Sequence, residues 1–373
     1  MKYYLISGEA SGDLHGAGLI RELKKLDPEG IFRCWGGDLM EKQGAALVKH
    51  YKELAFMGFA EVLMNIRRIM KNFSLCKEDI LKFQPDVVIL IDYPGFNLRM
   101  AKFIKDSGIR VFYYISPQVW AWKQNRVYKI KRYVDKMFVI LPFEKDFYKK
   151  FNYNVDFTGH PLTDAIEDKK KGFRDFETFV KEHGLSGKPV IAVLPGSRKQ
   201  EIKTKLPIML SAAKHYPDYE FVIARTSSVE PAFYQQNITG NVKVLTDKTY
   251  ELIHHAKAAI VKSGTSTLET ALIGTPEVVC YKSPTYLSYI IAKQVIKVKY
   301  ISLVNLIPDK PVVKELIQYD FTEEKLKKEL DELLFNETYR IRMKQNFEML
   351  KEHLGGTGAS KRAAELMRKY LDT

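Results

Sequence analysis

Short runs of consecutive hydrophobic residues alternate along the chain with longer stretches in which apolar residues recur every three or four positions. The short runs are typical of buried parallel strands, and the longer stretches are typical of helices that cover a sheet. This alternation predicts an α/β fold with parallel sheets. Strands are expected at residues 2–7, 32–35, 85–91, 111–115, 137–141, 190–194, 221–224, 242–245 and 258–261.

The alternation is interrupted by a charged segment, residues 168–188, which we interpret as a linker and domain boundary. Strand and helix patterns restart after it, so we expect two βαβ domains with a cleft between them. The predicted parts of the chain are an amino-terminal domain at residues 1–168, a second domain at 185–345 and a final helical part at 346–373.

Residues 260–276 hold the strongest candidate for a ligand site. A strand end is followed by small residues and then by a helical pattern, which places free N–H groups and the positive end of a helix dipole around one point. A phosphate fits such a point. The small residues are Ser263, Gly264, Thr265 and Ser266. In the alternative interpretation, Ser266 and Glu269 form an S-x-x-E capping box and bind no ligand.

A similar turn follows the strand expected at residues 190–194. It contains Gly196, Ser197 and Arg198. A guanidinium at a strand end can bind a pyrophosphate through two N–H groups. The alternative for Arg198 is a surface salt bridge.

The first strand is also followed by a glycine-containing loop. Its candidate residues are Gly8, Glu9, Ser11 and Gly12. The glycine spacing is not G-x-G-x-x-G, so a tight structural turn is as good an interpretation as a nucleotide-binding loop.

Asp92 follows the most hydrophobic strand of the first half. Ligands of open α/β sheets bind outside the carboxyl ends of the strands, so a carboxylate there is well placed to act as a general base. The alternative is that Asp92 caps the turn or the following helix. For His160, farther along, packing or capping is the better interpretation than catalysis.

A segment rich in Met, Phe and Leu, residues 54–71, precedes that strand. It is either a core helix with a basic end or an interfacial helix that contacts acyl chains and phosphates. The residues expected to make such contacts are Phe56, Met57, Phe59, Val62, Leu63, Arg67 and Arg68.

The formal net charge of +14 suits anionic lipid headgroups, phosphorylated substrates or nucleic acid. We expect no nucleic acid, because the sequence contains no zinc-ligand spacing and no aromatic RNA-binding strand. Three separated cysteines without metal-ligand spacing indicate a reducing cytoplasm and no disulfide framework. No segment is apolar enough to span a membrane, so membrane contact is expected to be peripheral.

A set of motifs in fixed order resembles the lipid-A-disaccharide synthases. The resemblance covers nearly the whole chain, from Ser7 to about Ile317. The motifs are GEASGD at 8–13, IDYPGFN at 91–97, SPQVWAW at 116–122, LPFE at 141–144, GHP at 159–161, LPGSR at 194–198, SGTSTLE at 263–269, YISLVNL at 300–306 and VKELI at 313–317. The chain departs from the family pattern at Gly95, where the family often has a second acid.

This resemblance implies an inverting glycosyltransferase of the GT-B architecture, with two Rossmann-like domains and a C-terminal helix that returns to the first domain. The implied reaction transfers 2,3-diacylglucosamine from UDP-2,3-diacylglucosamine to the 6-hydroxyl of 2,3-diacylglucosamine 1-phosphate, giving the β-1,6-linked lipid A disaccharide 1-phosphate and UDP. The family implies no metal or other cofactor, a cytoplasmic location at the inner face of the inner membrane and, in some members, exchange of C-terminal parts in a swapped homodimer.

The resemblance also implies roles for single residues. Asp92 is expected to take the proton of the acceptor hydroxyl, and Arg198 to stabilise the departing diphosphate together with the helix start after Ser263. Glu269 is expected to bind the ribose hydroxyls, and Asn305 to lie near the diphosphate or sugar. The loop from Gly8 to Gly16 is assigned to the acceptor side.

Two other classes of protein fit parts of this pattern. A UDP-sugar epimerase shares the double Rossmann layout but needs acid and base groups around the sugar and no lipid surface. A non-catalytic nucleotide-sugar or lipid-binding protein would keep Arg198 and the helix start without needing Asp92. A Rossmann dehydrogenase fits less well, because the first glycine loop has the wrong spacing.

Overall fold

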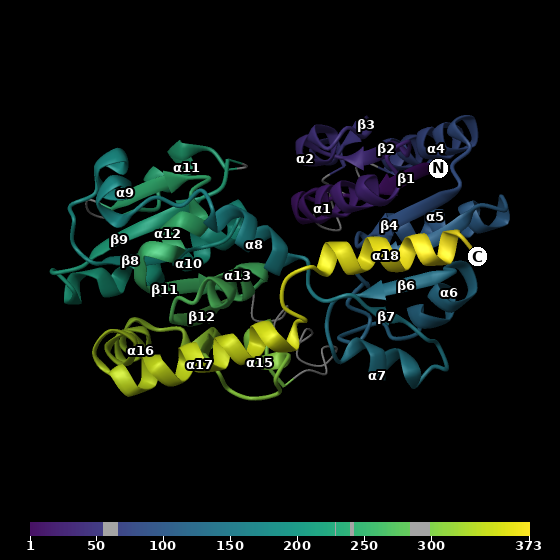
Figure 1. Cartoon of the computed structure of the whole chain (residues 1–373). Helices are drawn as coiled ribbons and strands as arrows, with labels where there is room; N and C mark the ends of the chain where they lie inside the picture. Colours follow the sequence, from purple (N-terminus) through teal and green to yellow (C-terminus); the bar gives the residue numbers. More distant parts are fainter. Residues whose placement is uncertain (55–65, 228, 239–241, 284–298) are drawn as a thin grey trace. The chain divides into compact units, whose positions relative to one another are not determined.

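The chain forms two compact α/β units in the computed structural model, which describes residues 1–54, 66–227, 229–238, 242–283 and 299–373. One unit comprises Met1–Ala165 together with Leu354–Thr373, and the other comprises Ile166–His353. Each contains one parallel sheet with helices packed on it (Figure 1). The predicted fold class, α/β with two Rossmann-like domains, is therefore confirmed.

The first unit contains a seven-stranded sheet in the order β3-β2-β1-β4-β5-β6-β7, with every neighbouring pair parallel. The central strand β4 is buried along its whole length, as its unbroken apolar run predicts. The strands are β1 (Lys2–Ile6), β2 (Ile31–Gly36), β3 (Ala46–His50), β4 (Val87–Ile91), β5 (Arg110–Tyr114), β6 (Lys136–Val139) and β7 (Asp156–Phe157). The helices are α1 (Ala10–Leu26), α2 (Asp38–Lys42), the 3₁₀ turn η1 (Tyr51–Glu53), α4 (Ile66–Phe83), α5 (Pro94–Asp106), α6 (Arg126–Tyr133), α7 (Glu144–Lys149), α8 (Leu162–Lys170), which continues into the second unit, and α18 (Ala359–Leu371).

The second unit contains a six-stranded sheet in the order β10-β9-β8-β11-β12-β13, again with parallel neighbours. The strands are β8 (Val190–Leu194), β9 (Glu220–Arg225), β10 (Lys243–Thr246), β11 (Ala256–Lys262), β12 (Glu277–Tyr281) and β13 (Lys314–Ile317). The helices are α9 (Phe176–His183), α10 (Lys199–Ser211), η2 (Ala212–His215), α11 (Pro231–Gln235), α12 (Thr249–His255), α13 (Thr265–Ile273), α15 (Leu303–Leu306), η3 (Gln318–Asp320), α16 (Glu323–Phe335) and α17 (Glu337–His353).

The segment predicted as a linker is part of the second unit. Helix α9 places Phe179, which is fully buried, in the same apolar cluster as β8 and β11. The charged residues that suggested a linker cover the outer side of this helix, and its apolar face packs inward.

The last helix, α18, packs beside α1 in the first unit (Figure 1). Its carboxyl end accepts hydrogen bonds from the Arg110 guanidinium at the main-chain oxygens of Tyr370 and Leu371, each at 3.0 Å. Three residues of the preceding glycine-rich break, Gly355 to Gly358, have positive φ angles, which turn the chain sharply after α17. The predicted return of a C-terminal helix to the first domain is therefore confirmed.

Candidate functional site

Each sheet has one point at which the strand order reverses, between β1 and β4 in the first and between β8 and β11 in the second. The crossover connections leave such a point in opposite directions, so the carboxyl ends of the two strands open a crevice there, and open α/β sheets bind ligands in it. The loop that begins at Ser7 and the turn at Asp92 meet at the first point. The turns after Leu194 and Lys262 meet at the second.

The turn at Asp92 holds two consecutive residues in the left-handed region, Asp92 at φ +42° and Tyr93 at φ +49°. Three hydrogen bonds hold this turn. Asn97 Nδ2 and Tyr113 Oη donate to the main-chain oxygen of Asp92 at 2.8 and 2.6 Å. The Asp92 N–H donates to the main-chain oxygen of Tyr114 at 3.1 Å. Non-glycine residues persist in this region only where their surroundings enforce it, often at functional sites.

The carboxyl group of Asp92 is half-buried and lies outside these three bonds. Its pKa is raised to about 6, chiefly by burial and also by the negative charge of Glu9. A hydrogen bond with the Tyr93 main chain acts in the opposite direction. A carboxylate with a pKa near neutrality is a stronger general base than an exposed aspartate.

Close packing explains why Gly8 and Gly12 of the first loop are glycines. A Cβ atom on Gly8 would lie 2.4 Å from the Tyr93 ring, and one on Gly12 would lie 2.8 Å from the Ser7 Cβ. Gly8 therefore allows close packing against the Asp92 turn, and Gly12 allows close packing against Ser7. Glu9 and Ser11 are exposed at the start of α1, where they remain free to face a ligand.

Glu144 is an acidic residue of this sheet edge that the sequence did not single out as a site. Its side chain is 1% exposed, and its Oε2 accepts hydrogen bonds from the main-chain N–H groups of Ile140 and Leu141 at 3.2 and 2.9 Å. Its pKa is raised to about 7, chiefly by burial and also by the charge of Asp92, while the two main-chain hydrogen bonds act in the opposite direction. The LPFE motif at 141–144 was the available signal for this residue.

His160 is a packed residue. Its ring is 4% exposed, lies 6.2 Å from the ring of His15, and accepts a hydrogen bond from the Leu162 N–H at Nδ1 (3.2 Å). Burial lowers its pKa to about 3, so the ring is neutral at physiological pH. This environment agrees with the packing or capping role favoured from the sequence.

The turn after β8 exposes its functional groups. Gly196 has φ +109°, and Ser197 and Arg198 are exposed. Arg198 is the N-cap residue of α10, next to the free N–H groups of the first helical turn. Its Nη1 is 4.0 Å from Glu201 Oε1, the weak surface ion pair anticipated as the alternative.

The turn after β11 leads into α13. Gly264 is the N-cap residue of α13, so no side chain caps the helix. Ser266 therefore lies inside the helix, and the S-x-x-E capping box considered from the sequence does not form. Glu269 instead accepts a hydrogen bond from Tyr250 Oη at 2.9 Å, and burial raises its pKa. Exposed Gly264 and Thr265 keep the helix start accessible.

Asn305 has a structural role in this conformation. Its Oδ1 accepts from the N–H groups of Val312 and Val313, and its Nδ2 donates to the oxygen of Val313 and to Glu315 Oε1, at 2.8–3.0 Å. Both ends of the carboxamide are occupied and the residue is 1% exposed, so Asn305 braces the loop before β13.

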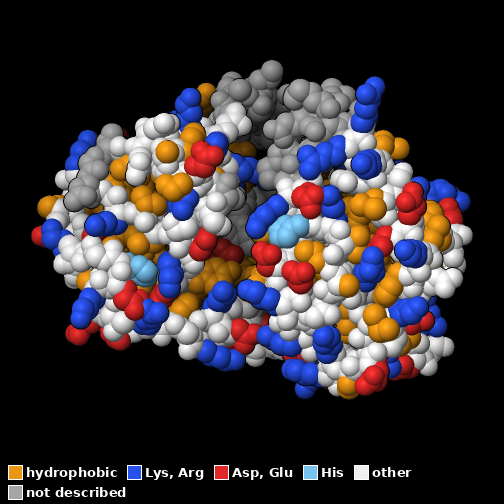
Figure 2. Space-filling model, turned by 90° about the horizontal axis from the view of Figure 1, so that it is seen from above, with side chains coloured by type: hydrophobic (Ala, Val, Ile, Leu, Met, Phe, Trp, Pro, Cys, Tyr) orange, Lys and Arg blue, Asp and Glu red, His pale blue; other side chains and the backbone are white. Residues whose placement is uncertain are grey.

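The predicted membrane contacts Phe56, Met57, Phe59, Val62 and Leu63 lie outside the described residues. Arg67 and Arg68 are exposed near the start of α4, where Arg68 Nη2 donates to the Glu53 main-chain oxygen at 3.3 Å. Within the described ranges no helix has both the length and the apolar character needed to cross a bilayer. On the face shown in Figure 2, Lys and Arg side chains are scattered among Asp and Glu.

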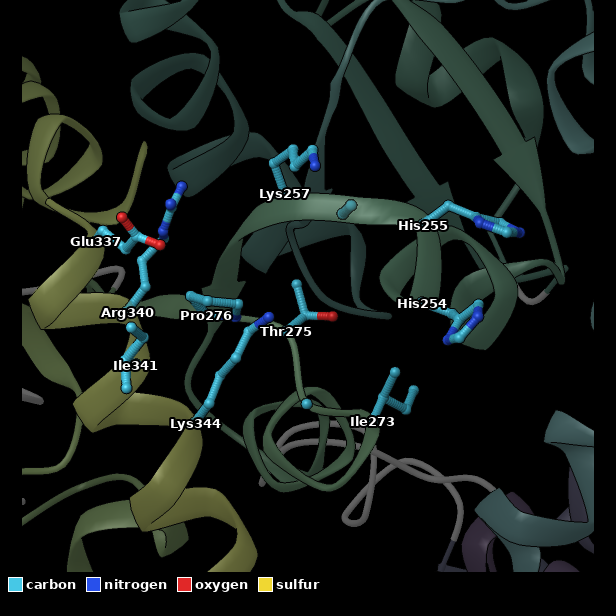
Figure 3. A pocket seen from close by; sticks show the side chains of 12 residues that line it. His254, His255, Lys257, Ile273, Thr275, Pro276, Glu337, Arg340, Ile341 and Lys344 are labelled. Carbon is cyan, nitrogen blue, oxygen red and sulfur yellow. The ribbon is translucent and has the colours of Figure 1, made fainter. Parts of the chain in front are cut away.

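A pocket of the second unit lies at the other edge of its sheet, where β11 and β12 begin. Figure 3 shows Lys344 of α17 reaching toward Thr275, with the Arg340 guanidinium beside Glu337. None of the residues predicted as a site lines this pocket. The candidate donor residues are on the opposite, carboxyl edge of the sheet.

Comparison with known proteins identifies the family. The family model described as lipid-A-disaccharide synthetase matches residues 3–369. The chain belongs to this family. A lipid-A-disaccharide synthase of Trichlorobacter lovleyi is 38% identical over 377 residues, covering 99% of this chain and 97% of that protein. One from Nitrosococcus oceani is 39% identical over 376 residues, covering 99% and 96%. This lipid-A-disaccharide synthase family member is thus a glycosyltransferase of lipid A biosynthesis, as the motifs predicted.

Solved structures of similar fold include two enzyme classes. The UDP-GlcNAc 2-epimerase of Neisseria meningitidis, bound to UDP-GlcNAc, superposes with a TM-score of 0.69 at 17% identity, covering 99% of this chain and all of that one. The calicheamicin glycosyltransferase CalG4 superposes with a TM-score of 0.60 at 16% identity, covering 100% of this chain and 98% of that one. At these identities the likeness concerns the fold alone. The synthase family, and not the epimerase, is indicated by the sequence relatives.

Proposed function

We propose that this enzyme transfers 2,3-diacylglucosamine from its UDP donor to the 6-hydroxyl of 2,3-diacylglucosamine 1-phosphate, with inversion at the anomeric carbon. The products are the β-1,6-linked disaccharide 1-phosphate and UDP. The observation that carries the proposal is the Asp92 turn, where a strained main chain presents a carboxylate of raised pKa at a sheet switch point.

In a single inverting displacement, the acceptor oxygen attacks the anomeric carbon as the bond to the UDP oxygen breaks. The Asp92 carboxylate accepts the proton that the hydroxyl loses, and the departing UDP carries away the electron pair of the broken bond. Exposed Glu9 and Ser11 beside this turn are the proposed contacts on the acceptor side.

The donor is assigned to the second switch point. Arg198 and the open starts of α10 and α13 supply positive potential for the negative charge that develops on the diphosphate, and Glu269 is proposed to bind the ribose. These groups perform the task that a divalent cation performs in other transferases. We therefore propose a metal-independent reaction, with turnover retained in excess EDTA.

Acylated substrates must be taken from a membrane. We propose that the enzyme works at the cytoplasmic face of the inner membrane and makes peripheral contact through residues 54–71. Arg67 and Arg68 are the charged part of this segment. Flotation with anionic liposomes should decrease for Arg67→Ser with Arg68→Ser, and unchanged flotation would exclude this contact.

The reaction is tested with the UDP donor in the presence and absence of the acylated sugar 1-phosphate. Acceptor-dependent UDP release, with a β-anomeric linkage in the product by NMR, is the expected result. Interconversion of the donor sugar without acceptor would indicate an epimerase instead. Donor binding with neither reaction would indicate a binding protein.

A further inference from the structure

Lys262 lies between the two turns assigned to the donor. Strands β8 and β11 are paired with Leu194 opposite Val261, so Lys262 comes level with the turn that begins at Pro195. A Cβ atom on Gly196 would lie 3.5 Å from Lys262 Cδ, and one on Gly264 would lie 3.3 Å from its Nζ. The side chain therefore fills the space between both glycine turns, and the glycines leave room for it.

Glu201 holds this lysine in place. Its Oε1 is 3.0 Å from Lys262 Nζ, and the two side chains are 17% and 23% exposed. Glu201 comes from the first turn of α10, so the pair joins the start of that helix to the end of β11. An ammonium group has three N–H donors and this ion pair uses one of them, which leaves donors for a further partner.

The positive charge around Glu201 is in excess. Three cations, Arg198, Lys205 and Lys262, surround one carboxylate. Lys205 is 3% exposed, and burial lowers its pKa, with the charges of Lys262 and Arg198 acting in the same direction. Partly buried positive charge without a matching negative charge is unfavourable, and a bound anion would balance it.

We propose that Lys262 is a ligand of the donor diphosphate and that Glu201 keeps its ammonium in position before the donor binds. This inference rests on the proposed function, because it takes the anion to be the diphosphate of a UDP-sugar. A lysine serves here as a compact positive charge beside the Arg198 fork. Glu201 lowers the entropic cost of binding by restricting a flexible side chain in advance. The alternative is that the pair only fastens α10 to β11.

The test is calorimetric titration of UDP and uridine into Lys262→Met, a variant of similar length without charge. UDP affinity should fall roughly ten- to one-hundredfold, the contribution of one hydrogen bond to a charged group. Uridine affinity should stay unchanged, and UDP binding should become less sensitive to salt. The matched control is Lys257→Met, which removes an exposed lysine from the other end of the same strand. It should bind UDP as the wild type does.

Comparison of Lys262→Met with Glu201→Gln separates the two interpretations, because glutamine can still accept the hydrogen bond from Lys262 but carries no charge. If Lys262 is a ligand, Lys262→Met loses UDP affinity while Glu201→Gln binds UDP with equal or higher affinity, whereas a purely structural pair predicts that both variants lose stability and neither loses UDP affinity. Lys262→Arg should restore most of the affinity, and Lys262→Gln replaces Lys262→Met if the latter does not fold.

The outcomes distinguish a failure of the Lys262 proposal from a failure of the proposed function on which it rests. Wild-type affinity for UDP in a folded Lys262→Met variant would overturn the role of Lys262 and leave the glycosyltransferase proposal standing. Absence of UDP binding by the wild-type protein would overturn the donor assignment and this inference together.

Discussion

The hydroxyl of Tyr113 donates a 2.6 Å hydrogen bond to the main-chain oxygen of Asp92. Tyr113 is fully buried on β5, and Asp92 is the first residue after the neighbouring strand β4. The rigid sheet thereby fixes a strained turn at its carboxyl edge. The position of the proposed base depends on this main-chain bond.

Tyr113→Phe should lower turnover because it releases the Asp92 main chain. We expect kcat to fall between about tenfold and one-hundredfold, the effect of a displaced catalytic group, while UDP affinity stays the same. The free energy of unfolding should fall by about 0.5–1.5 kcal/mol. Tyr153→Phe is the control, since Tyr153 Oη also donates to a main-chain oxygen, that of Val134 at 3.2 Å, before β6. Equal turnover in the two variants would contradict the positioning role.

The rate should decrease in acid as Asp92 becomes protonated. Its pKa of about 6 predicts that kcat/KM drops about tenfold per pH unit below that value, because only the deprotonated carboxylate accepts a proton. Glu9→Gln removes a negative charge that raises this pKa, so the acid limb should move to lower pH. The pH profile of Glu29→Gln, a matched change at an exposed site beyond the other end of α1, should stay that of the wild type. An acid limb that stays in place in Glu9→Gln would refute this coupling.

Arg198→Ala should weaken UDP binding without affecting uridine, because the guanidinium is assigned to the diphosphate. A loss of roughly ten- to one-hundredfold is expected by calorimetry. Arg342→Ala, which removes an exposed arginine of α17, serves as the control. Identical UDP affinity in both variants would place the diphosphate elsewhere.

Glu277 predicts a pH-dependent stability. Its side chain is fully buried on β12, and neither carboxyl oxygen has a hydrogen-bond partner within the part of the chain that the structure describes. Burial raises its pKa well above the unfolded value, so the folded protein keeps a proton that the unfolded chain releases as the pH rises. Its contribution to stability is therefore greatest below about pH 4.3 and is lost at higher pH.

Glu277→Met should accordingly stabilise the protein by about 1–3 kcal/mol near neutral pH, and by less in acid. Urea unfolding at neutral and at acidic pH measures the free energy of unfolding of this variant and of the wild type. Glu324→Met, a matched change at an exposed position of α16, is the control. A Glu277→Met variant less stable than the wild type at neutral pH would show that the carboxyl group has a favourable partner.

Features that depend only on residues adjacent in the sequence could be predicted from it. The apolar run of β4 identifies a buried strand by itself, and Asp92 necessarily follows it. The small residues after β8 and β11 likewise mark turns before helices. Strand order is different, because it depends on which runs pair across the whole chain. The meeting of Glu9 with Asp92 at one switch point therefore emerged only from the sheet.

The same reason explains why the contacts of several site residues could not be predicted from the sequence. Glu269 accepts a hydrogen bond from Tyr250, a residue of the preceding helix, and its hydrogen bond with Ser266 is made within α13 and is not a helix cap. Asn305 is occupied by the loop that precedes β13. Lys262 lies within residues 260–276, the strongest candidate ligand site of the sequence, yet its partner Glu201 lies on α10, far away in sequence.

The most direct test of the central claim is the turnover of Asp92→Asn with saturating donor and acceptor. This variant keeps the size of the side chain and removes its ability to take a proton. The rate should fall by about two to four orders of magnitude, with UDP affinity unchanged. Near-normal turnover by the folded variant would contradict the assignment of Asp92 as the base.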